Sequence, residues 1–148
     1  MKDIVRIKSV MTPFPYSIDA HQSLSEARAL MDEHQIRHLP VRDGEQLLGV
    51  LSDRELQLVI ERTRGEAVFP EPKVKDAISD QVYIVDLQTP LAEVAEKMSE
   101  RRIGSTLVTK AGKLVGVFTV TDACRCLASF LVTGDFDPDP LQKRAAIS

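Results

Sequence analysis

The chain contains one pattern twice, 67 residues apart, and this repeat limits its fold more than any other feature. Shifting the sequence against itself by 67 residues aligns identical residues without a gap. The aligned pairs include Lys8 with Lys75, Tyr16 with Tyr83, Asp19 with Asp86, Leu24 with Leu91, Glu26 with Glu93, Met31 with Met98, Glu33 with Glu100, Ile36 with Ile103, Val41 with Val108, Gly49 with Gly116 and Val50 with Val117. Two copies, unlike the three or more of a solenoid, predict halves that pack on each other about a pseudo-twofold axis.

Each copy contains a junction at which a buried strand is expected to pass directly into a helix. The junctions are residues 49–55 and 116–122, in which Ser52 aligns with Thr119 and Glu55 with Asp122. Backbone N–H groups at the start of a helix are unpaired, and the helix dipole is positive there. Hydroxyl groups and a carboxylate at such a point surround a natural binding spot for a polar ligand that carries phosphate.

Hydrophobic periodicity and turn residues predict the same order of elements in both copies. In the first copy we expect an extended lead-in over residues 10–18, a helix over 23–34, strands over 36–41 and 47–51, and a helix over 55–62. In the second copy we expect a helical turn over 74–79, a strand over 83–85, a helix with Thr89 as N-cap and Pro90 at its first position, strands over 105–108 and 114–118, and a helix over 121–132.

The boundaries of the copies follow from breaks in this periodicity. Residues 1–62 form the first domain, with its core over 8–62, and residues 74–132 form the second. Residues 63–73 contain Gly65, Pro70 and Pro72 and are expected to be a linker. Residues 133–148 are expected to be an acidic, flexible tail. The tail's alternating carboxylates lack the glycine and the bidentate glutamate of a calcium loop, so we expect no metal there.

Composition excludes several classes of protein. The formal net charge is −3, and no block of Lys and Arg offsets it, which argues against a nucleic-acid partner. No apolar run approaches the roughly 20 residues of a membrane span and no signal peptide is recognisable, so a cytoplasmic location is expected. Cys124 and Cys126 are two residues apart on a predicted helix, so we expect them on different faces as reduced thiols, without a disulfide or a metal.

Four motifs together resemble a tandem pair of CBS (cystathionine-β-synthase) domains, the arrangement called a Bateman module. The motifs are Val10-Met11-Thr12-Pro13, His38-Leu39-Pro40-Val41, Gly49-Val50-Leu51-Ser52-x-x-Glu55 and Gly116-Val117-Phe118-Thr119-x-x-Asp122, and the resemblance covers about residues 8–132. It implies the α/β (α+β) fold class, with one β-α-β-β-α unit in each copy. It also implies two sheets packed together with helices outside, and commonly a dimer of such pairs.

The resemblance also implies a regulatory role. CBS pairs are typically sensors that bind AMP, ADP, ATP or S-adenosylmethionine in clefts between the two copies and pass the signal to another protein. Because the pair and its tail account for the whole sequence, we expect the effector protein to be a separate chain. No nucleophile set, phosphate-cradling loop or metal-ligand pair indicates an enzyme, and no cofactor is expected to be required. The alternative is a ligand-free dimerisation scaffold that uses the apolar residues Leu127, Phe130, Leu131 and Val132.

Carried over residue by residue, the resemblance implies two composite clefts. The first, preferred cleft would contain Thr12, Tyr16, Ile36, Arg37, His38, Thr119, Thr121 and Asp122. The second would contain Ser79, Tyr83, Ile103, Gly104, Ser105, Ser52, Arg54 and Glu55. Glu55 stands where the family usually has aspartate, and its extra methylene moves the carboxylate by roughly 1.5 Å. Arg54 could also neutralise Glu55, so we expect the second cleft to bind weakly or to be empty.

Simpler roles for the same residues stay open at this stage. Thr119 and Asp122 fit a helix cap with a first-turn acid, which needs no ligand. Tyr16 and Tyr83 fit aromatic residues of the core. His38 lies beside a strand, where a histidine is often satisfied by packing and one hydrogen bond.

Overall fold

The computed structural model describes residues 3–64, 66, 69–78 and 81–136 of the chain. These residues form two compact units. Unit 1 consists of the described parts of Met1–Pro15 and Tyr83–Ser148, and unit 2 of the described parts of Tyr16–Val82. Each unit contains most of one sequence repeat.

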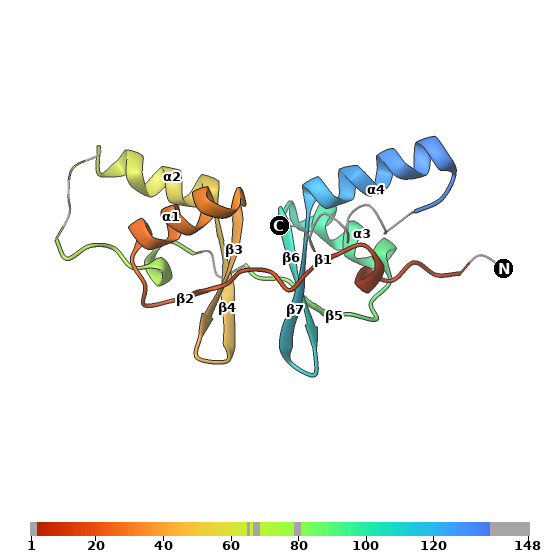
Figure 1. Ribbon diagram of the computed structural model, residues 1–148, viewed down its shortest axis with the longest axis horizontal. Helices are drawn as coiled ribbons and strands as arrows, with labels where there is room; N and C mark the ends of the chain where they lie inside the picture. Colours follow the sequence, from red (N-terminus) through yellow and green to blue (C-terminus); the bar gives the residue numbers. More distant parts are fainter. Residues whose placement is uncertain (1–2, 65, 67–68, 79–80, 137–148) are drawn as a thin grey trace. The chain divides into compact units, whose positions relative to one another are not determined.

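Unit 2 contains a three-stranded sheet with two helices along one of its faces (Figure 1). Its elements are β2 (Ile18–Asp19), α1 (Leu24–His34), β3 (His38–Asp43), β4 (Gln46–Ser52) and α2 (Asp53–Arg62), followed by a 3-10 turn at Val74–Asp76. The strand order is β2-β3-β4, in which β2 and β3 are parallel and β3 and β4 are antiparallel.

Unit 1 repeats this arrangement with an additional edge strand (Figure 1). It begins with a 3-10 turn at Ile7–Ser9 and β1 (Thr12–Pro13), and continues with β5 (Ile84–Asp86), α3 (Leu91–Arg101), β6 (Ser105–Lys110), β7 (Lys113–Thr119) and α4 (Val120–Thr133). The strand order is β1-β7-β6-β5. Both units therefore show the β-α-β-β-α order, which confirms the predicted fold class.

The core of each unit lies between its helices and its sheet. In unit 2 the apolar positions of α1 recur at helical spacing as Leu24, Ala27 and Met31, all buried. They pack with Leu39 and Leu51 from the two long strands. The equivalent cluster in unit 1 contains Leu91, Val94, Met98, Val108 and Phe118. Because the same positions are apolar in both copies, the two units bury the same faces of their helices.

Each repeat begins with a 3-10 turn, Ile7–Ser9 or Val74–Asp76, which we call its lead-in segment, and this segment packs on the core of the unit that contains the other repeat. Ile7 begins the first repeat, yet it is fully buried in the core of unit 1, and its N–H donates to the carbonyl oxygen of Thr89 at 2.8 Å. Val74 begins the second repeat and is fully buried in the core of unit 2. Each core is therefore completed by a segment distant in sequence.

One predicted cap is wrong. The helix α3 begins at Leu91 with Pro90 as its N-cap residue and without a side-chain cap, so Thr89 is not the N-cap. Pro90 aligns with Ser23, which does cap α1 by accepting a hydrogen bond from the N–H of Glu26. The helix start is the same in both repeats, and only the capping side chain differs. The remaining predicted elements are present, with ends that differ by a few residues.

The buried lead-in makes a prediction about stability. Ile7→Ala should lower the free energy of unfolding by about 2–5 kcal/mol, because it leaves a cavity in the core of unit 1. Ile4→Ala is the matched control, since Ile4 is 65% exposed, and should change it by less than about 0.5 kcal/mol. Urea unfolding of the three proteins measures both values. If Ile7→Ala and Ile4→Ala have the same free energy of unfolding, Ile7 does not contribute to the core as we describe.

Candidate functional site

The carboxyl group of Asp122 lies at the start of α4, directly after β7. Thr119 is the N-cap residue, and its hydroxyl oxygen accepts a hydrogen bond from the N–H of Asp122 at 3.3 Å. In return, Asp122 Oδ2 accepts hydrogen bonds from the N–H of Thr119 at 2.9 Å and from its hydroxyl group at 3.1 Å. This capping box fixes the orientation of the carboxylate, because each residue holds the other.

Thr12 approaches the same carboxylate from a distant part of the sequence. It lies in β1, which pairs antiparallel with β7 so that Thr12 is opposite Val117. Its hydroxyl group donates to Asp122 Oδ1 at 3.4 Å, and Arg125 Nη1 lies 4.0 Å from that oxygen. Among the described residues, Oδ2 thus has two short hydrogen bonds and Oδ1 only long contacts. We call Thr12, Thr119 and Asp122 the Asp122 cluster. In this cluster, Oδ1 of Asp122 is the oxygen that can still accept a short hydrogen bond.

Asp122 is buried, with 4% of its surface exposed. Burial raises the pKa of its carboxyl group above the ordinary value. The hydrogen bonds from Thr119, the charge of Arg125 and the hydrogen bond from Thr12 act in the opposite direction. A buried carboxylate with an incompletely satisfied oxygen is suited to accept hydrogen bonds from a ligand.

The other residues predicted for the first cleft lie in different places. Thr121 is exposed in the first turn of α4, beside the Asp122 cluster. Four of these residues belong to unit 2 and not to the unit that contains Asp122. They are Tyr16, Ile36, Arg37 and His38. Ile36 packs partly buried against the core of unit 2, and Arg37 is exposed. His38 begins β3 opposite Ser52.

Tyr16 is neither buried nor unpaired. Its ring stacks on that of His34 with centroids 3.7 Å apart and an interplanar angle of 14°, and 42% of its surface is exposed. The interpretation of Tyr16 as a core aromatic residue is therefore wrong. His34, the last residue of α1, supplies the stacking partner. Nothing in the spacing of these two residues indicates the contact.

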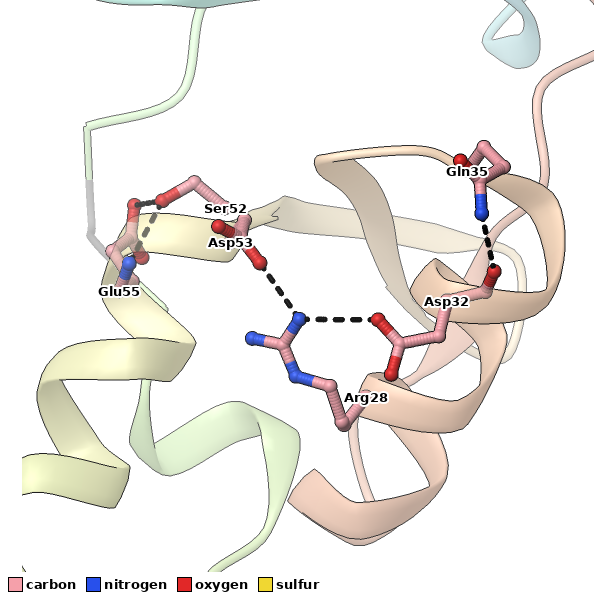
Figure 2. Close-up of polar contacts among 6 residues, drawn as sticks. All are labelled: Arg28, Asp32, Gln35, Ser52, Asp53 and Glu55. Atoms are coloured by element: carbon pink, nitrogen blue, oxygen red, sulfur yellow. Dashed lines mark hydrogen bonds and ion pairs between the residues drawn. The ribbon is translucent and has the colours of Figure 1, made fainter.

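The start of α2 repeats the geometry of the Asp122 cluster with a longer acid (Figure 2). Ser52 is the N-cap residue and accepts a hydrogen bond from the N–H of Glu55 at 3.1 Å, while its hydroxyl group donates to Glu55 Oε1 at 3.1 Å. Glu55 therefore turns back toward its own cap. Arg54 is exposed.

An ion pair that the sequence analysis missed holds the start of α2 against α1 (Figure 2). Arg28 Nη1 lies 2.7 Å from Asp53 Oδ1 and 3.4 Å from Asp32 Oδ1. The hydrogen bond to Asp53 is the main reason that the pKa of Arg28 is raised. The spacing of Arg28 and Asp32, four residues apart on one helix, is a recognisable signal. The contact of Arg28 with Asp53 joins two different helices, so no sequence spacing indicates it.

The remaining residues predicted for the second cleft belong mostly to unit 1. Ser105 begins β6 opposite Thr119, and the carbonyl oxygen of Gly104 accepts a hydrogen bond from the N–H of Val120 at 3.1 Å. Ile103 packs partly buried on the core. Tyr83 also packs on this core, and Arg101 lies 5.0 Å from the centroid of its ring. Ser79 lies outside the described residues.

Comparison with known proteins identifies the family. The model of the CBS domain matches the chain twice, over residues 7–62 and 74–129. The chain belongs to the CBS domain family. The two matches coincide with the two copies of the sequence repeat, which confirms the resemblance drawn from the motifs.

Relatives and solved structures show the same CBS domain pair. Hypoxic response protein 1 of Mycobacterium tuberculosis is 28% identical over 124 residues, which cover 81% of this chain and 83% of that protein. The crystal structure of AcuB from Vibrio cholerae is similar with a TM-score of 0.77 at 27% identity, covering 88% of this chain and 96% of that chain. The crystal structure of CBSX2 in complex with AMP has a TM-score of 0.66 at 27% identity and covers 84% and 97% of the two chains.

Two further findings concern the described part of this CBS pair. No helix in it is both long and apolar enough to cross a lipid bilayer. No three side chains among its His, Cys, Asp and Glu residues are grouped so that they could hold a metal ion. The two cysteines lie on different faces of α4, as predicted: Cys124 is exposed and Cys126 is buried. Burial raises the pKa of Cys126 to about 11, so this thiol is unreactive at neutral pH.

The burial of Asp122 makes a prediction about pH. A raised pKa means that the folded state holds this proton more tightly than the unfolded chain does. The resulting stabilisation is fully present below the unfolded pKa and is lost as the pH rises through the folded pKa. From about pH 4 to pH 7, the wild type should therefore lose stability relative to Asp122→Asn. Urea unfolding at several pH values measures this difference, and a relative gain for the wild type would show that the pKa is lowered instead.

Proposed function

We propose that this CBS pair is a regulatory module that binds an adenosine-containing ligand such as AMP, ADP, ATP or S-adenosylmethionine. The observation that carries the proposal is the Asp122 cluster, a buried carboxylate at a helix start with one incompletely satisfied oxygen. The structure of CBSX2 in complex with AMP supports the ligand class, since that protein is a 27% identical CBS relative.

The chemistry of ribose suits Asp122. Ribose offers two neighbouring hydroxyl groups as hydrogen-bond donors, and a carboxylate can accept from both. Asp122 Oδ1 is held only by the 3.4 Å contact with Thr12 and by the more distant Arg125, so a ribose hydroxyl group can replace the Thr12 contact at small cost. Thr121, which is exposed in the first turn of α4, would also contribute to this site.

The second site is proposed to bind more weakly. Glu55 occupies the position of Asp122, and its carboxylate accepts the hydroxyl group of its own cap, Ser52, at 3.1 Å. Asp122 accepts the hydroxyl group of Thr119 in the same way, so the expected difference rests on the displacement of the Glu55 carboxylate by one methylene. Arg54, which is exposed in the first turn of α2, would also contribute to this site.

The output of the module is proposed to be a change in a partner protein rather than catalysis. In the described residues we find a capped acid and backbone groups at the helix starts, and these suit binding and not bond cleavage. A ligand-free scaffold is the second candidate function, and the exposed apolar residues of α4 favour it.

Calorimetry with AMP, ATP and S-adenosylmethionine tests the proposed site. Asp122→Ala should weaken binding of the preferred ligand at least about 10-fold, because a charged hydrogen-bond acceptor contributes roughly 1.5–3 kcal/mol. Glu55→Ala, which changes the equivalent position, is the matched control and should have the smaller effect. If Asp122→Ala leaves the affinity unchanged while Glu55→Ala abolishes binding, the assignment of the two sites is reversed.

Thermal unfolding separates the sensor from the scaffold. A ligand at 100 times its dissociation constant should stabilise the wild type by about 2.7 kcal/mol and raise the melting temperature. Asp122→Ala should show a reduced shift at the same ligand concentration. Absence of a shift with every adenosine compound would refute the sensor and leave the scaffold.

A further inference from the structure

Arg125 places a positive charge beside the buried carboxylate of Asp122. Its Nη1 atom lies 4.0 Å from Asp122 Oδ1, the oxygen that has only long contacts. Burial raises the pKa of Asp122, and the charge of Arg125 opposes this rise. Within the described residues, Arg125 is the one charged side chain that acts on this pKa. Arg125 is therefore the cation that unit 1 itself supplies to the Asp122 cluster.

The guanidinium group of Arg125 is not committed to a structural contact. The side chain is 45% exposed, and it donates no hydrogen bond to any residue that the structure describes. Its separation of 4.0 Å from Asp122 is the limit for an ion pair and is too long for a hydrogen bond. A guanidinium group has five N–H donors in a planar fork, which matches the oxygen atoms of a phosphate group. These donors are available to a ligand.

The internal repeat shows that the capped acid does not need a cation at this position. Leu58 holds the position of Arg125 in unit 2 and is 45% exposed. Ser52 and Glu55 nevertheless form the same pair of cap and acid. Because the cap forms without an arginine at this position, we seek the partner of Arg125 in the ligand.

A ligand that carries phosphate needs a cation at this site because of the Asp122 carboxylate. If the ribose hydroxyl groups donate to Asp122, a 5′ phosphorus atom lies four bonds from C3′, or roughly 6 Å at most. The phosphate and the carboxylate are then within about one Debye length of each other, so their negative charges repel. The positive end of α4 offsets part of this repulsion. A guanidinium group next to the carboxylate can offset more of it, because it can pair with the phosphate directly.

We propose, on the basis of the proposed function, that Arg125 selects ligands with a 5′-phosphate group at the Asp122 cluster. On binding, a ribose hydroxyl group donates to Asp122 Oδ1, and the Arg125 guanidinium moves from this oxygen to the phosphate. Arg125 thereby exchanges a 4.0 Å contact for charge-assisted hydrogen bonds. The preferred ligands are AMP, ADP or ATP. Adenosine has no charge for Arg125 to pair with, and S-adenosylmethionine has a positive sulfonium group at its 5′ carbon.

Calorimetry with adenosine and AMP tests this selectivity, since the two ligands differ only in the phosphate group. In the tighter binding event, the wild type should bind AMP at least about 10-fold more tightly than adenosine. Arg125→Gln removes the charge and should weaken AMP binding about 10-fold or more, while adenosine binding changes less than about 3-fold. Arg125→Lys keeps the charge without the fork and should give an intermediate affinity for AMP.

Lys113→Gln is the matched control, because it removes a positive charge from an exposed residue at the far end of β7. This strand is seven residues long, or roughly 20 Å, so solvent and salt screen Lys113 from the site. The control should change the affinity for either ligand less than about 2-fold. Binding of adenosine by Arg125→Gln shows that this variant is folded.

Two results would overturn the role of Arg125 while the proposed function stands. One is an equal loss of affinity for adenosine and AMP in Arg125→Gln, because Arg125 would then only position Asp122. The other is a loss of AMP affinity of the same size in Lys113→Gln, because the effect would then belong to the net charge of the protein. A wild type that binds adenosine as tightly as AMP also refutes the selectivity alone, whereas a wild type that binds neither ligand refutes the proposed function as well.

Discussion

Burial of the two lead-in segments is the constraint on which both units depend. Ile7 and Val74 hold equivalent positions in the repeat, and each is fully buried in the core that contains the other repeat. Neither core is complete without an apolar residue supplied from outside its own repeat. The same exchange brings β1 beside β7, and with it the Thr12 hydroxyl group to the Asp122 carboxylate. The packing of the core and the construction of the candidate site are therefore parts of one arrangement.

The two helix starts show how a duplicated site can diverge while its backbone stays the same. In both, an N-cap hydroxyl group and an acid three residues later hold each other. Aspartate has the shorter side chain, and its second oxygen remains turned toward Thr12 and Arg125. Glutamate reaches its own cap through the side chain. Both acids accept the hydroxyl group of their own cap residue, so the two helix starts differ in the length of the acid and in the contacts of Asp122 with Thr12 and Arg125.

The outer faces of the helices diverged in the same way. Arg28 and Asp53 connect α1 and α2 by an ion pair, and the equivalent residues Ala95 and Val120 cannot form one. An ion pair at a partly exposed position contributes little to stability, because solvent screens it. Its larger effect here is on the surface, since it keeps charge on the helices of unit 2 where unit 1 is apolar. Duplication therefore leaves two similar cores with surfaces of different character.

The sequence by itself determined the features that depend on neighbours along the chain. The repeat, the β-α-β-β-α order, the buried face of α1 and the capping of α4 by Thr119 all follow from spacings of a few residues. The resemblance of the motifs to CBS domains added the grouping of Thr12 with Asp122, which are 110 residues apart.

Only the tertiary structure decided which surfaces meet. It places Ile7 in the core of unit 1, pairs Arg28 with Asp53 and stacks Tyr16 on His34. Periodicity identifies an apolar face, but it does not identify the segment that covers that face. On α4, where apolar residues lie on more than one side, periodicity does not distinguish the buried side from the exposed one. That distinction depends on contacts between residues that are far apart in the chain, and folding alone establishes them.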